Sequence, residues 1–137
     1  MPPCYGWGAK GRAYHASDMR VILVDPSRTA AKIVKATLEA RGHEVLTFAD
    51  GREALACVKA DPEVGALITT TEPLSMSGLE LCWETRLVSC PQRPIYVIMM
   101  SSSTDGDIRV LALDHGADDF IGKPPIADEL YARLRAA

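Results

Sequence analysis

The sequence lacks a basic excess, an aromatic cluster and a long apolar run, and each absence excludes a class of function. Of its 137 residues, 15 are Lys or Arg and 18 are Asp or Glu, which gives a formal net charge of -3. Nucleic-acid-binding domains usually carry a basic patch, so we expect no direct contact with nucleic acid. Aromatic residues make up only 6% of the chain, too few for a base-stacking groove. No apolar run approaches the roughly 18 residues that span a bilayer, so we expect no membrane insertion.

The four cysteines lie at positions 4, 57, 82 and 90, and no two of them have the CxxC spacing. The usual zinc and redox motifs are therefore absent, and we expect reduced thiols in a cytoplasmic protein. The remaining composition, 47% apolar and 24% charged residues, is ordinary for one globular domain that is long enough to bury a core.

The first 18 residues differ from the rest of the chain. They are rich in Gly, Pro and small residues and have no apolar segment of the kind found in secretory signals. We predict a flexible leader over residues 1–18 and one folded domain over residues 19–137. A GxGxxG string runs from Gly6 to Gly11, but a nucleotide-binding loop needs a preceding strand, and the chain has no room for one there.

From Met19 onward, short apolar segments alternate with segments of helical period. Strands are predicted over residues 20–24, 44–48, 64–69, 95–100 and 119–122, and helices over residues 27–41, 51–60, 77–89, 105–115 and 127–136. Five strand–helix repeats predict an α/β fold, with a five-stranded doubly wound parallel sheet and helices on both faces. In the first helix, the shared inner face is predicted to hold Ala30, Ile33, Val34, Thr37 and Leu38.

Polar residues follow the predicted strands at the edge where sheets of this kind bind ligands. Asp25 follows the first strand, Thr70 and Glu72 follow the third, Ser101 follows the fourth and Lys123 follows the fifth. A carboxylate, several hydroxyls and a lysine are therefore expected to converge at one rim. The Asp25-Pro26 pair also suits the cap and first position of a helix. Helix capping and a residual site remain equal alternatives for Asp25.

Four segments resemble the receiver domain of response regulators in two-component signalling, over about residues 19–137. They are VILVDPSRT (21–29), SMSGLEL (75–81), YVIMMS with its preceding Ile (95–101), and GADDFIGKP (116–124), which is the most specific. The resemblance implies flavodoxin-like winding with strand order 2-1-3-4-5. It also implies phosphoryl transfer from a kinase histidine to an aspartate after the third strand, with Mg²⁺ held by carboxylates.

The resemblance also implies roles for three residues that match the family pattern. Lys123 and Ser101 would bind the phosphoryl oxygens, and Phe120 would be the switch aromatic that follows the hydroxyl inward. The Lys123-Pro124 bond is expected to be cis. The resemblance implies that phosphorylation shifts the population of the domain between two conformations that already exist.

The site departs from the family pattern at two positions. Counting back from Gly78 places Thr70 at the phosphoacceptor position, and Pro26 replaces the second acid. Asp25 alone remains of three carboxylates, so it would hold Mg²⁺ weakly at most, and no cofactor is expected. A threonine cannot form an acyl phosphate, and no base accompanies it. Thr70 fits better as a β-branched strand residue than as a catalytic one.

These departures predict a degenerate receiver, or pseudo-receiver, which is not an enzyme and acts through protein contacts. Residues 133–137 continue a helical pattern without a stop signal, so the chain is expected to regulate a fused output domain or a protein partner. The resemblance also makes a homodimer through the fourth helix, fifth strand and fifth helix an expectation. The sequence names neither the kinase nor the output.

Two alternatives stay open. A working receiver would use Glu72 or Asp25 as the phosphoacceptor, since Lys123 and Ser101 are retained. A small ligand-binding α/β protein of another class, such as a flavodoxin, would carry a glycine-containing phosphate loop after the first strand, and residues 25–29 hold no glycine. Lys123 itself is expected to pair with Asp25 or face solvent, and pairing with Glu72 is less favoured.

Overall fold

The computed structural model describes residues 20–71, 76–102, 106–125 and 127–135. Its elements in chain order are β1 (Arg20–Val24), α2 (Arg28–Glu39), β2 (Glu44–Phe48), α3 (Gly51–Ala60), β3 (Val64–Thr70), α4 (Gly78–Val88), β4 (Tyr96–Ser101), α5 (Gly106–Asp114), β5 (Asp119–Gly122) and α6 (Ala127–Arg135). The predicted leader and its GxGxxG string lie outside the described residues.

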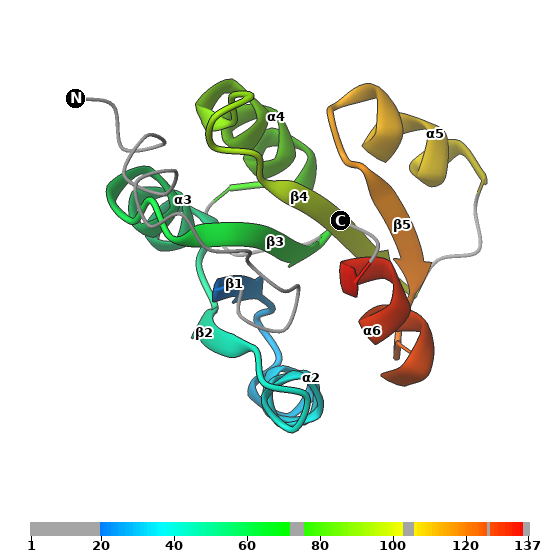
Figure 1. The fold of residues 1–137 in the computed structure, drawn as a ribbon. Helices are drawn as coiled ribbons and strands as arrows, with labels where there is room; N and C mark the ends of the chain where they lie inside the picture. The colour runs from blue at the N-terminus through cyan, green and yellow to red at the C-terminus, as the bar shows by residue number, and fades with distance from the viewer. Residues whose placement is uncertain (1–19, 72–75, 103–105, 126, 136–137) are drawn as a thin grey trace.

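The sheet has five parallel strands in the order β2-β1-β3-β4-β5. Helices α3, α4 and α5 cover one face, and α2 and α6 cover the other (Figure 1). The predicted fold class, the winding and the placing of helices on both faces are therefore confirmed. The order reverses at β1 and β3, so the carboxyl ends of these two strands flank the switch point where such sheets bind ligands.

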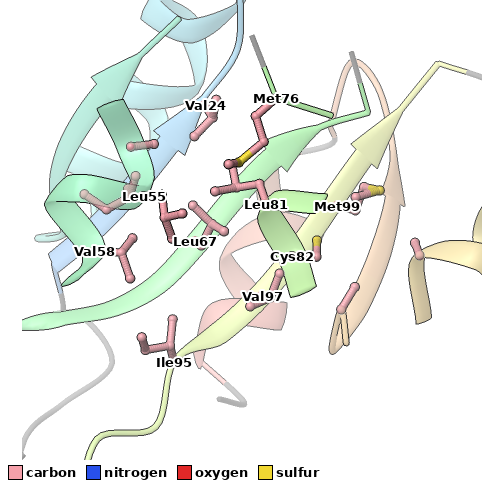
Figure 2. Close-up of a cluster of buried hydrophobic side chains, with 14 of the residues drawn as sticks. Val24, Leu55, Val58, Leu67, Met76, Leu81, Cys82, Ile95, Val97 and Met99 are labelled. Carbon is pink, nitrogen blue, oxygen red and sulfur yellow. The ribbon is translucent and has the colours of Figure 1, made fainter. Parts of the chain in front are cut away.

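Two apolar cores lie on the two faces of the sheet, because successive side chains of a strand point to opposite sides. Ile22 of β1 and Leu67 of β3 belong to the core under α3 and α4, which Figure 2 shows. Their neighbours Leu23 and Ile68 belong to the core under α2 and α6. Strands buried on both faces explain the near-continuous apolar runs in the sequence.

Several element boundaries differ from the predicted ones by one or two residues. Helix α2 begins at Arg28, because Ser27 is its N-cap and accepts a hydrogen bond from the N–H of Ala30 at 3.2 Å. Strand β3 extends to Thr70, and β4 runs one residue later than predicted, to Ser101. Thr70 and Ser101 are consequently the last residues of their strands, held by ladder hydrogen bonds instead of lying in loops.

The predicted inner face of α2 is wrong at Ile33, whose exposed fraction is 63%. The buried residues of this helix are Ala31, Val34 and Leu38. These positions are spaced by three and four residues and face the sheet directly. Ile33 lies on the flank of that stripe, where the neighbouring α6 does not cover it.

The three described cysteines are free thiols, as predicted; Cys82 is buried, whereas Cys57 and Cys90 are half-buried. Cys4 lies outside the described residues. Within the described ranges, no cluster of three or more metal-ligating side chains is found. Nor does that part of the chain contain a helix long and apolar enough to cross a membrane.

Candidate functional site

The predicted rim residues gather at the carboxyl ends of four neighbouring strands. Asp25 follows β1, Thr70 ends β3, Ser101 ends β4 and Lys123 follows β5. Ladder pairing brings Val24 opposite Thr69 and Ser101 opposite Gly122, so the strands end at nearly the same level. The N–H of Lys123 donates to the Ser101 carbonyl oxygen at 2.9 Å.

The Asp25 carboxylate is the most buried charged group of this rim, and its side chain has an exposed fraction of 0%. One oxygen, Oδ1, accepts a hydrogen bond from the N–H of Ser27 at 2.9 Å. The other, Oδ2, lies 2.8 Å from Nζ of Lys123. The predicted pairing of Lys123 with Asp25 is therefore confirmed.

The alternative that Asp25 caps the first helix is wrong. Ser27 holds the N-cap position, and neither Asp25 nor Pro26 belongs to α2. Asp25 instead stabilises the turn that leads into the helix, because its carboxylate accepts a hydrogen bond from the backbone N–H two residues further along the chain.

Thr70 is buried at an exposed fraction of 1%, and its Oγ1 finds no hydrogen-bond partner among the residues that the structure describes. Alternation along β3 places its side chain on the same face as Ile68, under α2 and α6. Continuing the alternation of β1 and β5 past their ends places Asp25 and Lys123 on that face too.

Gly78, the first residue of α4, fixes the spacing between this helix and Thr70. A Cβ atom at Gly78 would lie 2.2 Å from the carbonyl oxygen of Thr70, so only glycine lets the helix start against the end of β3. This contact is compatible with the count from Gly78 that assigns Thr70 to the phosphoacceptor position, because the two residues lie directly against each other.

Phe120 and Ser101 complete the predicted set. Phe120 is 8% exposed and lies in the core under α3 and α4, with the Arg109 guanidinium 5.9 Å from its ring centroid. Ser101 is buried. The Lys123-Pro124 peptide bond is cis, as the resemblance implies. Glu72 lies outside the described residues.

The described rim offers few donors to Mg²⁺. Asp25 is its single carboxylate and already has an ammonium group 2.8 Å away. Pro26 has no donor atom, and Thr70 offers only a neutral hydroxyl. Magnesium sites usually use one or two carboxylates together with substrate phosphate oxygens, so this set of side chains does not fit the ion.

A pocket of about 120 Å³ lies between α2 and the start of α6, and Asp25 and Lys123 line it. The pattern of the sequence does not predict this pocket. The exposed Ile33 also lines it, as does Pro125, which follows the cis-bonded Pro124. An apolar residue on the flank of a helix was the only local signal.

Comparisons with known proteins agree with this geometry. The model of the response regulator receiver domain family matches residues 21–135. The response regulator MprA of Mycolicibacterium vanbaalenii is 34% identical over 118 residues, which cover 86% of this chain and 49% of that protein. The transcriptional regulatory protein TcrA of Mycobacterium tuberculosis is 33% identical over 127 residues, which cover 92% of this chain and 49% of that protein.

Solved structures show the same winding. The chemotaxis protein CheY4 of Vibrio cholerae is similar with a TM-score of 0.77 at 28% identity, covering 86% of this chain and 97% of that one. A receiver domain from Methanospirillum hungatei has a TM-score of 0.77 at 25% identity, covering 86% of this chain and 91% of that one. The chain spans about half the length of the curated relatives it matches.

Proposed function

Because the chain belongs to the response regulator receiver domain family, we propose that it is a signalling module that has lost aspartyl phosphorylation and acts through protein contacts. The observation that carries the proposal is Thr70. It ends β3 at the phosphoacceptor position, and its hydroxyl is buried without a hydrogen-bond partner in the described structure. A hydroxyl there cannot make an acyl phosphate, and no described base can activate it.

The pairing of Lys123 supports the same proposal. In a phosphoacceptor site the lysine would bind an anionic acceptor and its phosphoryl oxygens. Here its Nζ lies 2.8 Å from Asp25, so the positive charge is already compensated inside the rim. The proposal accordingly includes no Mg²⁺ cofactor and no enzymatic reaction of the chain itself.

The contact surface is proposed to be the one formed by α5, β5 and α6. β5 is an edge strand of the sheet, and α5 and α6 flank this edge on opposite faces (Figure 1). Arg133 of α6 is 3.2 Å from Asp119 of β5. On α5, Val110 and Leu113 are exposed by 56% and 44%, and exposed apolar side chains that lie together often mark a protein-contact surface.

The proposed partners are a fused output domain, a separate protein or a second copy of the chain, in the cytoplasm. The relatives are named as response and transcriptional regulators, and the chain spans about half of their length. A fused output domain would therefore match the organisation of those proteins. Direct contact of this domain with nucleic acid is not part of the proposal, because its net charge is -3.

Intact-mass spectrometry after incubation with acetyl phosphate and Mg²⁺ tests the loss of phosphorylation. We expect no gain of a phosphoryl group by the native chain. A gain that persists in the Thr70→Ala variant would contradict the proposal and support the alternative acceptor, Glu72 or Asp25. A gain that Thr70→Ala abolishes would also contradict it, by making the threonine the acceptor.

A further inference from the structure

The pocket between α2 and α6 has the features of a small-molecule site. Its volume is about 120 Å³, and apolar side chains, among them Ile33, Val34, Met100 and Leu130, form most of its wall. Asp25 and Lys123 also line it. We propose that this pocket binds a small uncharged molecule with an apolar, ring-sized body and one hydrogen-bond donor that bonds to Asp25.

The volume sets the size of the ligand. An apolar cavity of roughly 150 Å³ in another protein stays free of water and takes up benzene. A pocket of about 120 Å³ is close to that size, so a single ring or an equivalent aliphatic group fits. A larger ligand would extend past Ile33 toward solvent, since this side chain is 63% exposed.

The Asp25 carboxylate supplies the polar anchor. Its Oδ1 is occupied by the N–H of Ser27. Its Oδ2 lies 2.8 Å from Nζ of Lys123 in an ion pair, but it accepts no hydrogen bond from the residues that the structure describes. A carboxylate oxygen has two acceptor positions, and buried acceptors are normally used. A ligand O–H or N–H would fill this position.

The ion pair selects against charged ligands. An anion would draw Lys123 away and leave a fully buried carboxylate uncompensated, which is strongly unfavourable. A cation would compete with Lys123 for the same oxygen while placing its charge against an apolar wall. A neutral donor adds a hydrogen bond and leaves the pair intact, so phenols and other single-ring molecules with one neutral donor represent the expected chemical class.

Such a ligand would touch both the rim and helix α6. It would contact Lys123, which follows the edge strand β5, and Leu130 of α6. Both belong to or adjoin the surface proposed for protein contacts. Regulation of protein contacts by such a ligand rests on the proposed function, whereas the binding site itself does not.

Protein-observed ¹H–¹⁵N NMR of the whole 137-residue chain tests the proposal with four probes of matched size: phenol, toluene, benzoate and benzylamine. Phenol should shift the amides of Ile33, Val34 and Leu130 saturably, with a dissociation constant on the order of 1 mM for so small a probe. Toluene lacks the donor and should bind about tenfold more weakly. Benzoate and benzylamine should bind more weakly than phenol.

Two matched variants locate the site. Ile33→Trp places an indole ring over the pocket and should abolish the amide shifts that phenol causes. Leu87→Trp changes a residue of similar exposure, 64% against 63%, on α4 at the opposite face of the sheet, and should leave phenol binding unchanged. Asp25→Leu removes both acceptor oxygens and should abolish the preference for phenol over toluene.

No saturable shift with any probe would overturn the proposal, as would phenol binding that Ile33→Trp leaves intact. Tighter binding of benzoate or benzylamine would overturn the selection for neutral ligands. Equal binding of toluene and phenol would refute the Asp25 anchor and leave an apolar socket for a partner's side chain. Phosphorylation by acetyl phosphate is scored separately by mass, so failure of the proposed function would be distinguished from failure of this site.

Discussion

Thr69 and Thr70 are adjacent buried threonines in one strand, but their hydroxyls have different surroundings. Thr69 Oγ1 donates to the Thr70 carbonyl oxygen at 2.9 Å. Thr70 Oγ1 has no partner among the described residues. A buried hydroxyl without a hydrogen bond destabilises the fold by roughly 1–3 kcal/mol, whereas a satisfied one contributes about 1 kcal/mol.

The free energy of unfolding should therefore respond oppositely to valine at these two positions. Thr70→Val keeps the shape and removes an unsatisfied group, so we expect an increase of about 1 kcal/mol. Thr69→Val loses a hydrogen bond and should give a decrease of similar size. Urea unfolding of both variants measures the pair, and a Thr70→Val protein less stable than Thr69→Val would show that the Thr70 hydroxyl has a partner.

Cys82 makes stability depend on alkaline pH. Burial is the main cause that raises the pKa of its thiol from 9.0 to about 12; Asp118 raises it further and Arg86 lowers it. The folded state thus holds the proton to higher pH than the unfolded state does. The stabilisation is complete below about pH 9 and is lost as the pH rises from 9 toward 12.

Between pH 8 and pH 10.5, the free energy of unfolding should consequently fall less for Cys82→Ala than for the native chain. Cys57→Ala is the matched control, because Cys57 is half-buried and its pKa is raised less. If Cys82→Ala leaves the alkaline loss of stability unchanged, folding does not raise the pKa of this thiol.

At the scale of elements, the alternation of apolar and amphipathic segments was enough to predict all five strands and all five helices of the described chain. Boundaries were harder. The start of α2 was predicted at Ser27, one residue early, because helical period does not separate an N-cap from the first helical residue. Asp-Pro also has the local chemistry of a helix start, which made Asp25 a candidate cap, but the second oxygen of Asp25 pairs with Lys123.

The buried face of α2 was also predicted incompletely, because it too depends on contacts between distant elements. Helical period groups Ile33 with Val34, but only tertiary packing decides which residue the sheet covers and which lies beside a gap. The pocket next to α6 arises from that gap. It could not be predicted from either helix alone.

Gly78 fixes where α4 starts, and its replacement tests this directly. Gly78→Ala would place a Cβ 2.2 Å from the Thr70 carbonyl oxygen, so the helix must move away from β3. We expect destabilisation of about 2–3 kcal/mol, measured by thermal unfolding. Gly106 is also the first residue of a helix, but nothing lies within 4 Å of a Cβ there.

Gly106→Ala is therefore the control, and it should be neutral or stabilising by up to about 1 kcal/mol. Equal effects of the two alanine variants would mean that the approach of α4 to the end of β3 is not tight. The count from Gly78 to Thr70 would then lose its structural support.

At the scale of the whole molecule, the sheet order accounts for the site more than any one motif does. Asp25, Thr70, Ser101 and Lys123 come from four separate segments and meet because parallel strands end at one edge. Their convergence and the Asp25–Lys123 pair could therefore be predicted from the alternation and the motifs. The burial of the Thr70 hydroxyl and the pocket could not, because both depend on side-chain packing across two layers.

The arrangement of the whole molecule also suggests that the receiver fold can exist without phosphoryl transfer. The fold, the lysine, the serine and the buried aromatic residue are present, and in the proposed pseudo-receiver the missing parts are the carboxylates that Pro26 and Thr70 would replace. If the account is right, restoring those carboxylates is enough to restore phosphoryl transfer.

The most direct test is intact-mass spectrometry of the native chain beside the Pro26→Asp, Thr70→Asp double variant, both incubated with acetyl phosphate and Mg²⁺. The single variant Thr70→Asp is the intermediate control and should be labelled less than the double variant, because one fewer carboxylate holds the metal. We expect no phosphoryl group on the native chain and one on the double variant. A labelled native chain, or an unlabelled double variant that is folded, would contradict the claim that these two positions separate this protein from a working receiver.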